Sequence, residues 1–202
     1  MKTKTFVLTA LFVVCWRLAL GQSGPPDPKR LAGAADSMLE AKQEGHALRV
    51  FSASVRSQIT SAASAMPADK YGFAPSEGEF KGVRSFGQQV KHLSATNHIL
   101  AAAALGEDPP ADAGDERGPE AVRTKADVLE YLSLSFERLD KAIDRIGDKS
   151  LPTKPSPISP LRGFEVTRLS LIEEALIHAF DHYGQMVVYM RMNGVVPPAS
   201  QP

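Results

Sequence analysis

Apolar residues recur at steps of three and four in four separate stretches of the chain, which is the spacing of one helix face. The stretches run from Arg30 to about Met66, from about Val83 to Leu105, from about Thr124 to Gly147, and from Val166 or Thr167 to Asn193. No stretch alternates apolar and polar residues, as a half-buried strand does. The pattern therefore predicts an all-α protein with the architecture of a four-helix bundle.

The apolar faces predict the core of the bundle. The expected core residues are Leu48, Phe51, Val55, Ile59 and Ala62 in the first stretch; Phe86, Val90, Leu93, Ile99 and Leu100 in the second; Val128, Leu132, Ser135, Phe136, Leu139, Ile143 and Ile146 in the third; and Leu171, Ala175, Met186 and Tyr189 in the fourth.

Helix breakers and capping residues mark the ends of the stretches. The residues expected to stop the helices are Pro67, Gly106, Gly147 and Gly194. Thr124 with Asp127 three residues on is a capping pair for the third helix, and Gly45 is a candidate break inside the first. The loops after the first two helices are long for simple hairpins, so we expect a crossover connection. The acidic, proline-containing loop 107–120 is expected to be exposed.

The amino terminus has the three-part layout of a secretory signal peptide. Lys2 and Lys4 precede the apolar run 6–16, and small residues follow just before Gln22. We predict a signal peptide over 1–21, with an uncut signal anchor as the alternative. Export to the periplasm or medium follows, without stable membrane association after cleavage. The rest would comprise a disordered lead-in (22–29), one helical domain (30–198) and a short tail (199–202).

Cysteine and charge exclude several functions. The only cysteine, Cys15, lies inside the signal run, so the mature chain would hold no thiolate nucleophile, no cysteine metal cage and no disulfide. Cleavage also removes three of the 23 basic residues and none of the 23 acidic ones, leaving a net charge of −3. We therefore expect no nucleic-acid partner.

The histidines are the candidate chemistry. His178 and His182 are four apart on a predicted helix, which places both rings on one face where they can bind one divalent ion together. This spacing alone is a weak signal, because two histidines hydrogen-bonded at the core edge would show it too. The third ligand is predicted to be His92, on the second helix. His46 and His98 are expected to be ordinary surface or rim histidines.

Three histidines without a fourth protein ligand would leave coordination positions open, the pattern of a reactive site. Glu174 or Gln185 are candidates to orient a ligating ring or carry a proton. The favoured alternative is that Glu174 and Asp181 are solvated and that Gln185 packs at a helix contact.

The segments MPADKYGFAP, SFGQQVKHLSATN and LIHAFDHYGQMVVYMRMNGVVPP resemble the DinB/YfiT-like superfamily of metalloenzymes, over about Ala47 to Pro198. The resemblance implies a four-helix bundle with crossover topology, often a homodimer. It also implies a three-histidine site for nickel, zinc, iron or manganese, whose ligands fall on His92, His178 and His182.

Proteins that the chain resembles include thiol-dependent isomerases and transferases, in which a metal activates a small thiol. An exported member would more naturally use metal-bound water as a hydrolytic nucleophile. We therefore expect a metal-dependent hydrolase or thiol transferase that acts on an unspecified small molecule, with no catalytic residue assigned beyond the ligands. The alternative is a non-catalytic helical module for binding or dimerisation.

Overall fold

The computed structural model describes residues 28–111, 113, 115–146, 152–153, 159 and 161–201. The predicted signal peptide, most of the lead-in and Gly147 lie outside the described residues. The chain divides into two units, Met1–Leu39 and Glu40–Pro202. In the first unit, the described residues 28–39 are helical. All contacts described below lie within the second unit.

The described elements are helices, short 3-10 turns and one minimal strand pair. In chain order they are α2 (Pro28–Ala65), η1 (Ala68–Lys70), α3 (Phe86–Leu105), α4 (Lys125–Asp144), β1 (Pro152–Thr153), β2 (Val166–Thr167), α5 (Arg168–Met192) and η3 (Pro198–Ser200). The four predicted helices are confirmed. The expectation of no strands was wrong in one detail, because β1 and β2 pair antiparallel over two residues each. None of the helices in the described part of the chain combines the length and apolar character that a membrane crossing needs.

Side-chain caps set the starts of three helices. Ser85, Thr124 and Thr167 each accept a hydrogen bond from the backbone N–H three residues on, and that residue's side chain accepts one in return. The cap at Ser85 explains why α3 begins at Phe86 rather than near Val83. At its other end Gly106 adopts φ 74°, a left-handed conformation that glycine tolerates, and ends the helix as predicted.

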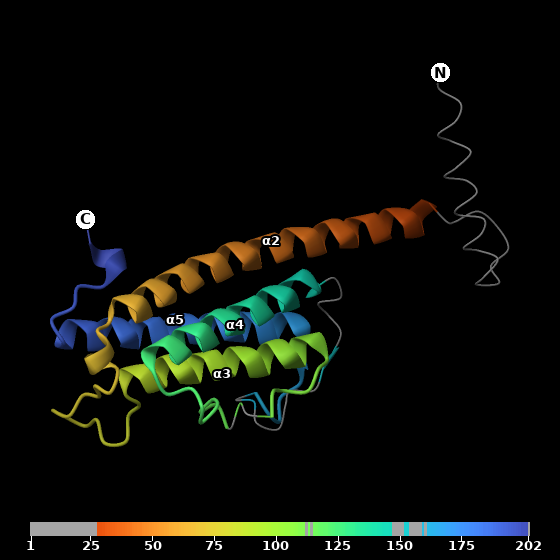
Figure 1. Cartoon of the computed structure of the whole chain (residues 1–202). Coiled ribbons are helices and arrows are strands. Elements are labelled where there is room, and N and C mark those ends of the chain that lie inside the picture. The colour runs from red at the N-terminus through yellow and green to blue at the C-terminus, as the bar shows by residue number, and fades with distance from the viewer. Residues whose placement is uncertain are drawn as a thin grey trace. The chain divides into compact units, whose positions relative to one another are not determined.

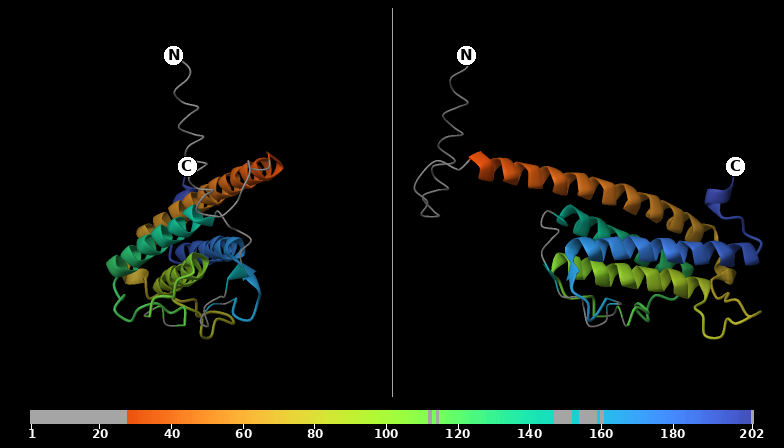
Figure 2. Two further views of the ribbon diagram at one scale, coloured as in Figure 1. Left: turned by 90° about the vertical axis from the view of Figure 1, so that its right-hand side faces the viewer. Right: turned by 180° about the vertical axis from the view of Figure 1, so that it is seen from behind.

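One connection between the helices, from α3 to α4, is a crossover, as expected. Lys125 at the start of α4 donates to the backbone oxygen of Met66, just past α2, and Arg49 of α2 pairs with Asp144 at the end of α4. These two helices are therefore antiparallel. Figure 1 shows α3 and α4 running in the same direction and α5 in the opposite one, and the reverse view in Figure 2 agrees. The loop between α3 and α4 must consequently return along the length of the bundle.

The predicted core is confirmed with one exception. Every residue of the expected faces is buried except Phe51, which is 56% exposed. Its neighbour Ser52 is fully buried instead and donates to the carboxylate of Asp140 on α4 at 3.0 Å. The proposed break at Gly45 was wrong, because α2 is continuous there and Gly45 lies close to Ile146.

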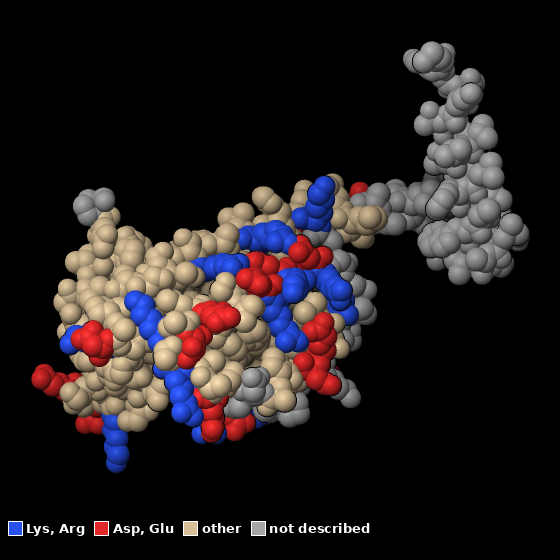
Figure 3. Space-filling view, viewed as in Figure 1, with Lys and Arg blue, Asp and Glu red and all other residues tan. Residues whose placement is uncertain are grey.

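Ion pairs cover the outer side of the contact between α2 and α4. Arg56 lies 3.2 Å from Asp140 and 4.0 Å from Glu137. Figure 3 shows basic and acidic side chains interspersed over the middle of this face. Exposed pairs of this kind contribute little stability, but they satisfy the polar groups along the seam.

Candidate metal centre

Two antiparallel helices bring the three predicted ligands together. His92 lies in the first half of α3, and His178 and His182 lie one turn apart on α5. A hydrogen bond of 2.8 Å from Nε2 of Gln89 to Oε1 of Gln185 joins the same two helices nearby. His92 and His182 are buried, and His178 is partly buried. The two helices therefore hold the three rings at a buried seam.

The three imidazoles point their Nε2 atoms at one another. The Nε2 of His178 is 3.2 Å from that of His92 and 3.0 Å from that of His182. In the described residues these are the only histidines, cysteines or acids of which three can offer ligand atoms within 4.8 Å of one another. The ring centroids are 4.4 to 5.0 Å apart, with the rings nearly perpendicular.

Neutral rings cannot satisfy both of these contacts by hydrogen bonding. The Nδ1–H of His92 donates to the backbone oxygen of Glu116 at 2.9 Å, so the Nε2 of a neutral His92 carries a lone pair. His178 Nε2 can then donate to His92 or accept from His182, but a single nitrogen cannot do both. A cation that receives a lone pair from each ring removes this conflict.

The spacing fits such a cation. At metal–nitrogen distances of about 2.0–2.1 Å, two ligand nitrogens lie about 2.9 Å apart at octahedral angles and about 3.4 Å apart at tetrahedral ones. The observed separations of 3.0 and 3.2 Å fall between these values. The donor set is one that zinc, nickel and iron all accept. That the three histidines bind an ion stays a prediction.

Burial keeps the rings in the form that binds metals. Burial, followed by the mutual repulsion of the protonated rings, lowers the pKa of His178 to about 3. Burial also lowers the pKa of His182 to about 4, with His92 and Arg84 acting in the same direction. For His92, burial again lowers the pKa, although the hydrogen bond to Glu116 opposes the shift. Near neutral pH all three rings are therefore uncharged, and each keeps one nitrogen with a free lone pair.

The loop between α3 and α4 supplies a part of the site that the sequence did not predict. Glu116, whose backbone oxygen accepts from His92, has φ 67°, and its neighbour Asp115 has φ 48°. They are the only non-glycine residues with positive φ in the described part of the chain. Such a conformation costs energy for residues other than glycine and occurs often at functional sites. The expectation of a wholly exposed loop was wrong, because Ala113 and Gly118 are buried.

The other candidate residues lie around the cluster rather than in it. Gln185 accepts from Gln89 and donates to Asp181 at 2.8 Å, so it joins two helices as the favoured interpretation proposed. Asp181 is exposed, and Glu174 is partly buried. No hydrogen bond in the described part of the chain links Glu174, Asp181 or Gln185 to a histidine ring.

The two remaining histidines differ from each other. His46 is exposed, as expected. The prediction for His98 was wrong, because it is only 8% exposed and its ring lies 4.9 Å from that of Tyr131 on α4. His98 faces away from the cluster, as its six-residue separation from His92 implied.

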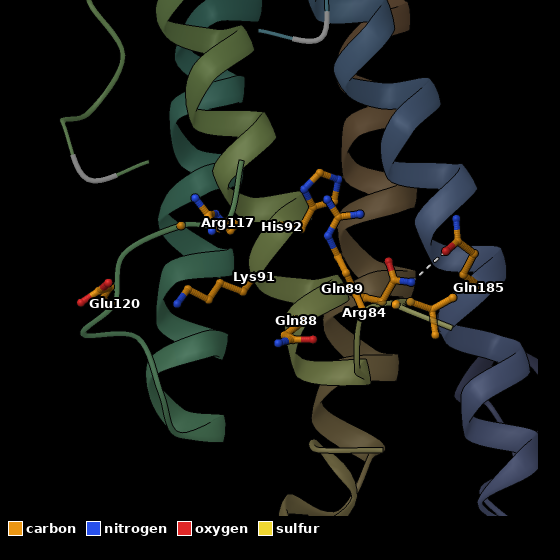
Figure 4. Close-up of a pocket in the computed structure, with 11 residues that line it drawn as sticks. Arg84, Gln88, Gln89, Lys91, His92, Arg117, Glu120 and Gln185 are labelled. Carbon is orange, nitrogen blue, oxygen red and sulfur yellow. Dashed lines mark hydrogen bonds between the residues drawn. The ribbon is translucent and has the colours of Figure 1, made fainter. Parts of the chain in front are cut away.

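A cavity of about 1080 Å³ opens beside the cluster, and His92 is part of its wall. Figure 4 shows the guanidinium group of Arg84 turned toward the His92 ring, with Gln89 and Gln185 below it. Lys91, Arg117 and Glu120 lie on the other side of α3 in this view. The cluster therefore adjoins a space large enough for a small molecule.

The fold and the cluster define a helical bundle with a three-histidine centre compatible with metal binding. A family model described as the DinB superfamily matches residues 53–186, and the chain belongs to that superfamily. A crystal structure of a DinB-like protein from Bacillus subtilis has a similar fold, with a TM-score of 0.54 and 20% identity, over 77% of this chain and 99% of that one. No curated protein is significantly similar to the chain.

Proposed function

We propose that the mature chain is an exported metal-dependent enzyme of hydrolase or transferase type, with a divalent ion held by His92, His178 and His182. The convergence of three Nε2 atoms at 3.0 and 3.2 Å beside a cavity carries the proposal. Among the described residues, no fourth histidine, cysteine or acid joins the cluster. Coordination positions are therefore open to water or substrate.

The chain's own residues have distinct roles in this proposal. Three neutral histidines leave the charge of a divalent ion undiminished, and such an ion polarises a bound substrate and favours the ionised form of water or a thiol. Glu116 holds the His92 ring by accepting from its Nδ1, which directs the Nε2 lone pair into the cluster. The buried seam between α3 and α5 limits the access of bulk water to two of the rings.

Elemental analysis of the mature protein, purified without chelator or histidine tag, tests the site. We expect about one divalent ion per chain. His178→Ala and His182→Ala should each abolish binding, whereas His98→Ala, which removes a buried histidine outside the cluster, should retain the ion. The proposal fails if the wild type stays empty after incubation with nickel, zinc, iron and manganese. Loss of the ion in His98→Ala but not in His92→Ala would show that the ligand assignment is wrong.

Export and homodimer formation are separate parts of the proposal. Export is supported by the signal-like segment 1–21, and amino-terminal sequencing of the secreted protein should begin at Gln22. Homodimer formation is supported by the family resemblance alone, and light scattering on the purified chain would decide it.

A further inference from the structure

We propose that the cavity binds a small molecule that carries both an anionic group, recognised by Arg84, and a hydroxyl or amine donor, recognised by Gln89. This inference rests on the proposed function, since it names the substrate class of the same site. Neither residue belongs to the predicted ligand set. The two approach the cluster from the same side of the cavity in Figure 4.

Arg84 supplies a positive charge that no salt bridge holds, although the Glu116 carboxylate is near enough to interact with it electrostatically. Its backbone is fixed, because its oxygen accepts from the hydroxyl of Tyr189 at 3.1 Å. Its guanidinium group, by contrast, forms no hydrogen bond or ion pair within the described part of the chain. Arg117, which also lines the cavity, differs in this respect because it lies 3.6 Å from the carboxylate of Asp115. Arg84 therefore has its donors available for a ligand.

The guanidinium group of Arg84 lies beside the cluster. Figure 4 shows it turned toward the ring of His92, which lines the same cavity. The three histidine rings are neutral, so the full charges beside them are the Arg84 guanidinium group and the Glu116 carboxylate, whose Oε2 lies 3.9 Å from Nδ1 of His92. An arginine fork matches the geometry of a carboxylate or phosphate, so an anionic group is the complementary ligand.

Gln89 offers an acceptor that lacks a donor. The carboxylate of Asp181 can only accept, so it fixes Nε2 of Gln185 toward itself and Oε1 of Gln185 toward Gln89. Nε2 of Gln89 therefore donates to Gln185, and Oε1 of Gln89 is left at the end of this series of hydrogen bonds. That atom is buried with no hydrogen-bond partner, and Gln89 as a whole is only 4% exposed. Gln89 nevertheless lines the cavity. A ligand hydroxyl or amine would satisfy it.

Matched small anions test both halves of the inference. Lactate and propionate share a carboxylate and a three-carbon skeleton, and only lactate adds a hydroxyl. We would titrate each, and glycerol phosphate in parallel, into metal-free and zinc-loaded mature protein, and follow backbone amide shifts by NMR. The variants would be Arg84→Gln, Gln89→Leu and, as the matched control, Arg117→Gln, each checked by its melting temperature.

We expect Arg84→Gln to weaken binding of the anions about tenfold or more, and Arg117→Gln to change it less than about twofold. Lactate should bind about threefold or more tightly than propionate, and Gln89→Leu should abolish that preference. The preferred anion, lactate or glycerol phosphate, identifies a carboxylate or a phosphate substrate.

Equal anion binding in wild type and Arg84→Gln would overturn the inference, and so would binding that requires zinc but not Arg84. If zinc does not load but Arg84-dependent binding to the metal-free protein is seen, the proposed function fails, while the cavity still stands as a binding site for small anions. If zinc loads and no anion binds up to high millimolar concentration, the inference fails and the metal site stands.

Discussion

The contact between His92 and the loop carbonyl of Glu116 gives a sharp test of how the site is built. Glu116 has φ 67°, and proline requires about −65°, so Glu116→Pro forces a rotation of about 130° at this residue. The carbonyl then moves away from Nδ1 of His92, to which it is 2.9 Å distant in the native chain. Glycine, by contrast, adopts positive φ readily and keeps the carbonyl in place.

The expected effect of Glu116→Pro follows from the role of such partners. Removing the oxygen that accepts the second ring N–H of a ligating histidine costs 10- to 100-fold in metal affinity, or about 1.4 to 2.8 kcal/mol. Glu116→Gly deletes the carboxylate, whose Oε2 lies 3.9 Å from the same nitrogen, yet retains the carbonyl. Its affinity should stay within about threefold of the wild type.

Competition between the protein and a chromogenic zinc chelator would measure these affinities. Circular dichroism of the metal-free variants would show whether each still folds. Equal zinc affinities in the two variants would refute the reasoning, because the carbonyl would then have no part in orienting His92. A loss in Glu116→Gly as large as in Glu116→Pro would assign the effect to the carboxylate instead.

Three further predictions concern stability. In metal-free protein the pKa values of His178 and His182, about 3 and 4, lie below their ordinary value near 6.5. The unfolded chain therefore takes up more protons than the folded chain as the pH drops from about 6.5 to about 3. The free energy of unfolding, measured by urea titration, should fall through that window by a few kcal/mol in total. A variant that carries both His178→Ala and His182→Ala should show a weaker pH dependence. Phe136→Ala, at a fully buried position, should cost about 3–5 kcal/mol in urea unfolding. Gly118→Val should lower the melting temperature, because φ is 71° and a Cβ atom there would lie 3.0 Å from Lys91.

Helix periodicity was sufficient for the bundle, and together with the family resemblance it predicted the convergence of the three rings. It misplaced residues where polar contacts decide burial. Ser52 faces the core because Asp140 accepts from its hydroxyl, while the more apolar Phe51 is left in solvent. Apolar spacing selects the phenylalanine and has no means of anticipating a hydrogen bond to another helix.

The error at His98 has a different origin. α3 contacts α4 on one side and α5 on the other, and almost all of its residues are buried. A helix surrounded in this way has almost no solvent-exposed face. A histidine that points away from the three-histidine cluster is therefore still buried against another helix. The run of alanines at 101–104 was the available signal for such a helix.

The hydrogen bond from His92 to Glu116 and the series of hydrogen bonds from Gln89 through Gln185 to Asp181 could not be predicted for a third reason. Each depends on the path of a loop or on contacts between residues 24 and 96 positions apart. Local spacing contains no information about such contacts. The capping pair of Ser85 and Gln88 is different, because its spacing was visible in the sequence and would have corrected the start of α3.

The distance along the chain between the three histidines has a consequence for how the protein would acquire the proposed ion. His92 and His178 are 86 residues apart and meet only when the last helix docks on the second of the four. The cluster therefore forms only once α3 and α5 have docked, and a fragment that lacks either helix does not contain it. Natural sites of this donor type discriminate poorly among divalent ions by affinity alone. If the cluster binds an ion as proposed, the ion most abundant where these helices dock would be the one incorporated, and for the exported protein proposed above that place depends on whether folding precedes export.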